Sequence, residues 1–199
     1  VADEVRTFLR RIESDLGTLS QLPVERDKYL WFNRNHHRPI WLRAEANLGP
    51  HELRPLISLY KEITFIDPTG MERLRIVDGV LSEKLRDVSD PANTTYLTET
   101  YFNSARELTE GQVYVSHVTG WHVGKQAQLA GAATPEEATD GAVYEGVVRF
   151  AKKVSTADGQ LKGIVVLSLD LAGPSDGAPF ISQQEERFVA FPSYQSGNY

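Results

Sequence analysis

Three arginines on predicted β-strands are the side chains in this sequence best suited to bind a small molecule. Arg73 and Arg75 alternate with Leu74 and Ile76, so the two arginines share one face of a strand. Arg149 lies among apolar residues of a later predicted strand. The planar guanidinium group pairs with a carboxylate through two parallel hydrogen bonds. These positions therefore predict a site for a small anionic or amino-acid-like ligand.

Aromatic and small polar residues accompany the arginines in the predicted elements. Tyrosine and tryptophan offer flat apolar surface together with a hydrogen-bond donor, which suits the wall of a pocket. The predicted ligand-binding residues are Arg73, Arg75, Tyr101, Tyr114, Ser116, Trp121, Tyr144, Arg149 and Asp170. The alternative is that this polar face of the sheet simply faces water, and the sequence leaves both possibilities open.

The sequence offers little for catalysis or for metal binding. It contains no cysteine, which excludes disulfides, thiolate metal ligands and thiol nucleophiles. His117 and His122 flank Trp121, but no acidic motif accompanies these two imidazoles. No nucleophile elbow, phosphate-binding glycine loop or HExxH motif is found. We therefore expect no enzyme activity, no cofactor and no bound metal.

Two further histidines, His36 and His37, occupy a predicted loop bounded by proline. Their imidazole rings are expected to cap a helix or to pair with an acidic side chain. Glu45 and Glu52 are the expected acidic partners.

Charge and composition narrow the class of protein. The chain has 199 residues, 41% of them hydrophobic, and a net charge of -6 without a basic block. This charge disfavours a nucleic-acid-binding protein and docking on an anionic membrane surface. No apolar run approaches the roughly 18 residues that cross a bilayer. Because the sequence begins within a helical pattern and stops abruptly at Tyr199, we expect a piece of a longer chain.

Hydrophobic periodicity predicts an α+β fold. Apolar residues recur every three or four positions over residues 5–19, and Pro23 ends this predicted helix. The turn sequences at 67–70 and 158–159 predict hairpins. The other predicted elements are helices at 26–35, 51–60 and 98–111, the last capped by Thr98, and strands at 60–67, 71–77, 112–118, 146–154 and 161–171.

Hairpin-linked strands imply a central antiparallel sheet of about five strands, with the helices stacked on one side and the long N-terminal helix packed on that face. Residues 120–143 are expected to fold over the second, arginine-bearing face as a lid. Residues 1–171 form the predicted domain, and residues 172–199 form a tail that is an added strand or the start of a further unit. The predicted apolar face consists of Leu74, Ile76, Val113, Val115, Val148, Phe150, Val165, Leu167 and Leu169.

The order of these motifs resembles the Cache (PDC) family, the extracytoplasmic PAS-like sensor domains of bacterial membrane receptors. The shared features are a long N-terminal helix, the Asp-x-x-Gly turn at 67–70, Tyr-Phe at 101–102 before the strand at 113–116, and a closing hairpin with Asp158-Gly159 and Gly163. Residues 33–49 and the long stretch at 120–143 depart from the family pattern.

This resemblance implies a periplasmic or extracellular ligand-binding domain of a histidine kinase, chemoreceptor or diguanylate cyclase. The expected partner is a small molecule, and the N-terminal helix is a candidate contact for a homodimer within a membrane-anchored parent chain. The rival hypothesis is a ligand-free interaction or dimerisation domain that senses a partner protein. A cavity beneath residues 120–143 would favour the first hypothesis, and a structure without a cavity there would favour the second.

Overall fold

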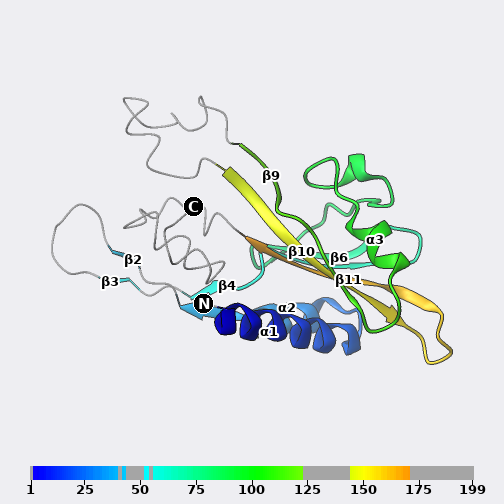
Figure 1. Ribbon diagram of the computed structural model, residues 1–199, viewed down its shortest axis with the longest axis horizontal. Helices are drawn as coiled ribbons and strands as arrows, with labels where there is room; N and C mark the ends of the chain where they lie inside the picture. Colours follow the sequence, from blue (N-terminus) through cyan, green and yellow to red (C-terminus); the bar gives the residue numbers. More distant parts are fainter. Residues whose placement is uncertain (1, 40–41, 44–51, 54–55, 123–143, 171–199) are drawn as a thin grey trace.

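A computed structural model describes residues 2–39, 42–43, 52–53, 56–122 and 144–170. Its centre is an antiparallel sheet with the strand order β7-β6-β5-β11-β10-β8, and β9 pairs with another part of β10 (Figure 1). All five predicted strands are present, as β5, β6, β8, β10 and β11. The sheet also contains two short strands that were not predicted, β7 and β9. The strands are β5 (Glu62–Ile66), β6 (Glu72–Val77), β7 (Val80–Leu81), β8 (Val113–Val115), β9 (Thr119–His122), β10 (Tyr144–Ser155) and β11 (Leu161–Asp170).

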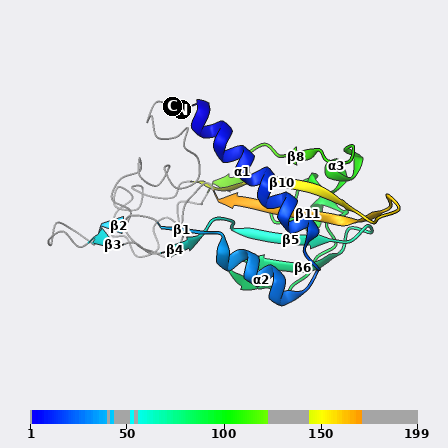
Figure 2. The same ribbon diagram turned by 90° about the horizontal axis from the view of Figure 1, so that it is seen from below.

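Helices α1 (Ala2–Gln21) and α2 (Arg26–Asn35) lie across one face of this sheet (Figure 2). The apolar stripe of α1 is fully buried at Ile12, Leu16 and Leu19, where it meets alternate residues of the central strands. Helix α1 ends two residues before Pro23, as the sequence predicts. The predicted α+β class and the packing of the long helix on one face are thus confirmed.

The opposite face of the sheet is also covered, which corrects the expectation that all helices stack on one side. Helix α3 (Tyr101–Glu107) and the short 3₁₀ helix η1 (Pro91–Asn93) lie there. Phe102 and Ala105 of α3 pack on Ile164 and Val166 of β11, forming a second apolar core. Central strands therefore carry apolar residues on both faces over part of their length, as sheets buried on both sides do.

The tight turn between β5 and β6 forms as its residue types predict. The backbone N–H of Gly70 donates to the carbonyl of Asp67 at 3.0 Å, and the Asp67 carboxylate accepts from the N–H of Thr69 at 2.8 Å. Gly70 has a φ of +99°, and a Cβ built on it would lie 2.5 Å from Cβ of Ser89. Glycine is required here both by backbone conformation and by close packing.

Three local predictions are wrong. The 51–60 stretch forms strands, since β4 (Leu56–Ser58) pairs with β1 (His37–Pro39), and β3 (Glu52–Leu53) pairs with β2 (Leu42–Arg43). Helix α3 begins at Tyr101 with Thr100 as its N-cap, in place of the predicted Thr98. Val115 is 51% exposed, because β8 is short and its end lies away from both cores.

The expected lid falls mostly at 123–143, outside the described residues, as does the tail from 171 onward.

Candidate functional site

Arg149 lies on the α3 side of the sheet with only 2% of its side chain exposed. Its Nε donates to Glu99 at 2.7 Å, and its Nη1 donates to Ser168 at 2.6 Å and to Glu62. Its Nη2 donates to Thr95 and to Glu99, each at 3.2 Å. A guanidinium group has five N–H donors, so every donor of Arg149 already has a protein partner.

Glu62 of β5 joins Arg149 to two further arginines. Its Oε1 accepts from Nε of Arg75 at 2.6 Å and from Nη2 of Arg86 at 3.4 Å. Arg86 also donates to both carboxylate oxygens of Glu72, at 2.8 and 3.2 Å. Burial acts to raise the pKa of Glu62, but the charges of the surrounding arginines outweigh it and lower this pKa to about 2.

We call these six residues the arginine–glutamate cluster: Arg75, Arg86, Arg149, Glu62, Glu72 and Glu99. Three positive and three negative charges give the cluster a formal charge of zero. The sequence-based expectation of a cationic face is therefore corrected by the structure, because each of these arginines faces a glutamate from its own chain. The burial of so many charges is tolerated because each one is paired and hydrogen-bonded.

Tyr101 also belongs to this region, as predicted. Its ring centroid lies 5.2 Å from Cζ of Arg149, a cation–π distance, and Tyr101 is 2% exposed. Burial is the main reason why the pKa of Tyr101 is raised, so its phenol stays neutral.

The other predicted site residues lie apart from the cluster. Ser116 contacts the backbone of Arg149 and not its guanidinium group: the Oγ of Ser116 accepts from the backbone N–H of Arg149 at 2.9 Å. Tyr114 packs on the α3-side core, and the exposed Arg73 donates to Asp67 at 2.6 Å. Backbone pairing places Tyr144 opposite His122 and Glu145 opposite Trp121, while the side chains of Trp121, Tyr144 and Asp170 lie outside the described residues.

A surface cavity of about 360 Å³ lies beside β6, where the 81–85 segment approaches the start of α2. Two predicted site residues, Arg73 and Arg75, line it together with Arg26. We call it the arginine cavity; its remaining lining residues are Leu74, Leu81, Ser82, Glu83 and Leu85. Three bases and one acid line the cavity, but Glu62 already neutralises Arg75 and Asp67 pairs with Arg73.

Arg26 and Arg73 are the cationic groups of this cavity that retain free donors. Among the described residues, none forms an ion pair with Arg26, and Arg73 uses only its Nε toward Asp67. Arg75 is held in place from behind by Glu62. The arginine cavity can therefore accept an anionic group without displacing a buried glutamate.

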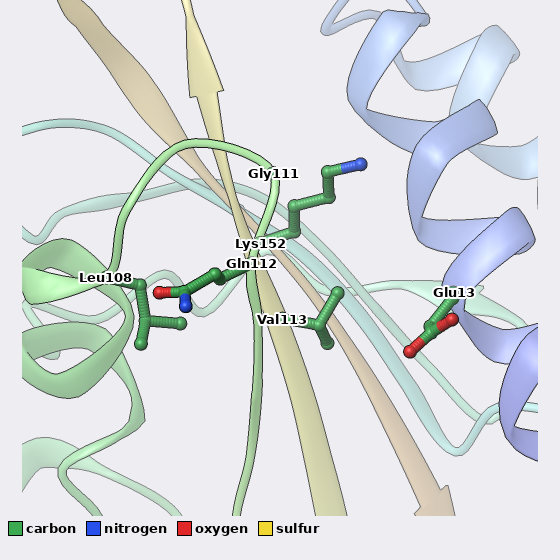
Figure 3. Close-up of a pocket in the computed structure, with 6 residues that line it drawn as sticks. All are labelled: Glu13, Leu108, Gly111, Gln112, Val113 and Lys152. Atoms are coloured by element: carbon green, nitrogen blue, oxygen red, sulfur yellow. The ribbon is translucent and has the colours of Figure 1, made fainter.

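Two other cavities are lined by fewer basic side chains. One, of about 520 Å³, is lined by residues 84–87, residues 92–95 and Leu97, and it reaches Arg86 of the cluster. The other, of about 380 Å³, lies between α1 and the loop from α3 to β8 (Figure 3). Glu13 and Lys152 contribute one charge of each sign to this last cavity.

Sequence reasoning missed the glutamates and Arg86, which determine the charge of the site. Glu62 and Thr64 alternate with Ile63 and Phe65, so the period of two along β5 was a usable signal for Glu62. Glu99 and Arg86 lie in irregular segments, where no periodicity marks the buried side. Among the described residues, no group of three or more His, Asp or Glu side chains is arranged to hold a metal ion.

No protein-family model matches this sequence, and no curated protein matches it. Several solved structures do match. One is the extracellular domain of a protein described as a histidine kinase, with a TM-score of 0.37 and 23% identity, over 57% of this chain and 34% of that chain. A domain of a sensory box/GGDEF family protein from Vibrio parahaemolyticus matches with a TM-score of 0.37 and 22% identity, over 56% and 36% of the two chains.

The sensory domain of the Campylobacter jejuni chemoreceptor Tlp3 matches with a TM-score of 0.44 and 11% identity, over 83% of this chain and 54% of that chain. A second structure of the Tlp3 domain contains isoleucine. These four structures are domains of proteins described as a histidine kinase, a sensory box/GGDEF family protein and a chemoreceptor. This chain spans about a third to a half of the length of these structures.

Among the described residues, no helix has the length and apolar character needed to span a membrane.

Proposed function

We propose that this domain is the extracytoplasmic ligand-binding sensor domain of a transmembrane signalling receptor. Its ligand is a small molecule with a carboxylate group, either anionic or amino-acid-like, and it binds in the arginine cavity. The observation that carries this proposal is that Arg26 and Arg73, which both keep free donors, line one cavity of about 360 Å³ in an acidic chain. The order of the sequence motifs supports the receptor class.

The lining of the cavity suits an amino acid in both of its charged groups. A ligand carboxylate can accept from the free donors of Arg26 and Arg73, while Glu83 is available for an ammonium group. Arg26 is the first residue of helix α2, at the end of the helix whose dipole favours anions, and the acidic Glu25 and Asp27 beside it partly offset this effect. Leucines at 74, 81 and 85 provide apolar contact for a side chain.

The energies of these contacts are on the scale of micromolar binding, which corresponds to about 8 kcal/mol. Where the ligand shields an arginine from water, each hydrogen bond to it contributes about 1.5–3 kcal/mol, and apolar contact adds about 25 cal/mol per Å². An arginine left exposed contributes about 1 kcal/mol or less, and association itself costs about 4 kcal/mol or more. The ligand therefore has to shield both arginines from water and cover the leucine side chains.

Ligand binding in this cavity would act on the helical layer. Arg26 belongs to α2, whereas Arg73 and Arg75 belong to β6, so a carboxylate between them bridges a helix and the sheet. A change in the position of α2 reaches α1 through the shared apolar core. This coupling provides a physical route from the ligand to the N-terminal helix.

The proposal is tested by isothermal titration calorimetry of the full 199-residue chain against amino acids and small mono- and dicarboxylates. We expect at least one compound to bind with micromolar affinity. The double variant Arg26→Ala/Arg73→Ala, which alters exposed side chains, is expected to weaken that binding about a hundredfold. Arg10→Ala, an exposed arginine of α1, is the control and is expected to leave affinity unchanged.

Binding that survives the double variant would place the ligand elsewhere, for example in the cavity beside Arg86. If no compound from these classes binds, the rival hypothesis of a ligand-free interaction domain is favoured instead.

A further inference from the structure

His36 joins the two helices of the α1–α2 layer. It follows the last residue of α2 as the C-cap, and its Nδ1 lies 2.6 Å from the carbonyl oxygen of Phe32. Its Nε2 lies 3.2 Å from Oδ1 of Asp15, which belongs to α1. The imidazole ring stacks on the ring of Phe32, with centroids 3.9 Å apart and planes 22° apart. The side chain is therefore fixed in orientation by contacts on both nitrogens and on one ring face.

Both imidazole nitrogens face oxygen atoms that only accept hydrogen bonds. A carbonyl oxygen has no hydrogen to donate, and neither has an ionised carboxylate. A neutral imidazole carries one N–H, so either neutral tautomer directs a nitrogen lone pair at an oxygen lone pair. Only the imidazolium form, with an N–H on each nitrogen, satisfies both contacts at once.

The remaining groups around His36 stabilise the same arrangement. Tyr60 donates its hydroxyl to Oδ2 of Asp15 at 2.5 Å, so both oxygens of this carboxylate are engaged. Nε of Arg11, one turn earlier on α1, lies 4.0 Å from Oδ2 of Asp15. The Arg11 guanidinium is therefore a second, more distant positive partner of this carboxylate. The neighbouring His37 makes its contact with the carbonyl of Arg34, and not with Asp15. Asp15, His36 and Tyr60 form what we call the His36 cluster.

We propose that the His36 cluster is a pH-sensitive set of contacts that holds α1 to the rest of the domain. The contacts are intact when His36 is protonated and are weakened when His36 loses its proton. They join α1, α2 and the chain that leads into β5. His36 caps α2, one of the two roles expected from the sequence, and pairs with Asp15, whereas Glu45 and the side chain of Glu52 lie outside the described residues. Solution pH thereby changes how firmly the N-terminal helix is held, independently of any ligand in the arginine cavity.

The direction of the pH effect follows from the two titrations. Burial alone would lower the pKa of His36, but the hydrogen bonds to Asp15 and to Phe32 outweigh it, so this pKa is raised above 6.5. The stabilisation is therefore complete below about pH 6.5 and is lost as pH rises through the folded-state pKa. Burial would raise the pKa of Asp15, yet its hydrogen bonds to His36 and Tyr60 lower it below 3.8. Its contribution persists above pH 3.8 and is lost as pH falls through that lowered value.

The primary experiment is an NMR titration of the histidines in the ligand-free 199-residue chain, together with hydrogen exchange of α1 amides at pH 6 and pH 9. We expect a His36 pKa above 6.5, lowered in Asp15→Asn. After correction for intrinsic exchange rates, the protection of α1 amides is expected to be higher at pH 6 than at pH 9. His36→Gln is expected to remove this difference between the two pH values.

The control is His37→Gln, an adjacent histidine without contact to Asp15, which is expected to keep the pH difference. If His36→Gln does not fold, the titration of the unaltered chain still decides the matter, with sequential backbone assignment identifying the signal of His36 among the five histidines. A His36 pKa at or below 6.5, or equal protection of α1 at both pH values, would overturn the proposal. Because no ligand is present, neither result depends on the function proposed above.

Discussion

At the scale of single residues, the arginines fall into two groups with different roles. Arg149 has all of its donors bound to its own chain and almost no exposed surface, so its role is to hold the α3 side of the sheet together. Arg26 and Arg73 are exposed and keep free donors toward a cavity. The residue type alone does not separate these roles. Burial and the position of nearby carboxylates do.

Removing the charge of Arg149 should destabilise the domain strongly. Arg149→Ala leaves Glu62 and Glu99 buried without their principal partner, and such a loss typically costs about 3–5 kcal/mol. Urea denaturation followed by circular dichroism measures the change in the free energy of unfolding. Arg10→Ala, which is exposed, is expected to change it by less than about 0.5 kcal/mol. Equal values for the two variants would show that the cluster contributes little.

Two buried tyrosines are expected to respond in opposite directions when the hydroxyl group is removed. Among the described side chains, the hydroxyl of Tyr29 is buried with no hydrogen-bond partner, whereas that of Tyr60 donates to Asp15. Tyr29→Phe is therefore expected to raise the free energy of unfolding by about 1 kcal/mol, and Tyr60→Phe to lower it by a similar amount. Thermal and urea unfolding of both variants would detect the opposite shifts. A loss of stability in Tyr29→Phe would mean that its hydroxyl does find a partner.

At the scale of elements, the turn after β5 is a packing contact as well as a change of direction. Gly70 sits against Ser89 so closely that a methyl group has no room, while Gly159, in the other hairpin, has nothing within 4 Å of the equivalent position. Both glycines have positive φ values. The two positions therefore separate backbone strain from steric overlap.

Alanine substitutions at these glycines should differ in cost. Gly159→Ala is expected to lower the free energy of unfolding by about 1–2 kcal/mol through backbone strain alone. In Gly70→Ala the clash with Ser89 adds about 1–3 kcal/mol to that strain. Equilibrium urea unfolding of the two variants gives the comparison. If Gly70→Ala were the milder change, the 87–89 segment would have to move away from the turn without cost.

The elements themselves could be predicted wherever the signal lies within a few residues. The alternation of Leu74 and Ile76 with arginine, and the Asp-x-x-Gly turn, are local patterns, and both are confirmed. The 51–60 stretch has no such clear period, and the prediction of a helix there is wrong. Short strands that pair with distant segments have no local signature.

At the scale of the whole molecule, the candidate site is formed by contacts between residues far apart in the sequence. No local sequence pattern indicates such contacts. The Arg149 side chain meets Glu62 across 87 positions of sequence and Glu99 across 50. The presence of a polar face was predictable from alternation, but its neutral charge was not. Only the folded arrangement shows which arginines are already paired and which remain available. Whether the predicted site residues bind a ligand stays a prediction.

Strand β10 lies between the two layers, and its neighbouring side chains point in opposite directions. Phe150 packs in the core beneath α1, while Arg149, one position away, belongs to the arginine–glutamate cluster on the other side. A shift of β10 along β11 by a single position would drive a guanidinium into hydrocarbon and carry an aromatic ring among carboxylates. Slippage between β10 and β11 is thus strongly disfavoured. If the domain transmits a signal as proposed, displacement of the helices over the sheet is a route that keeps this register.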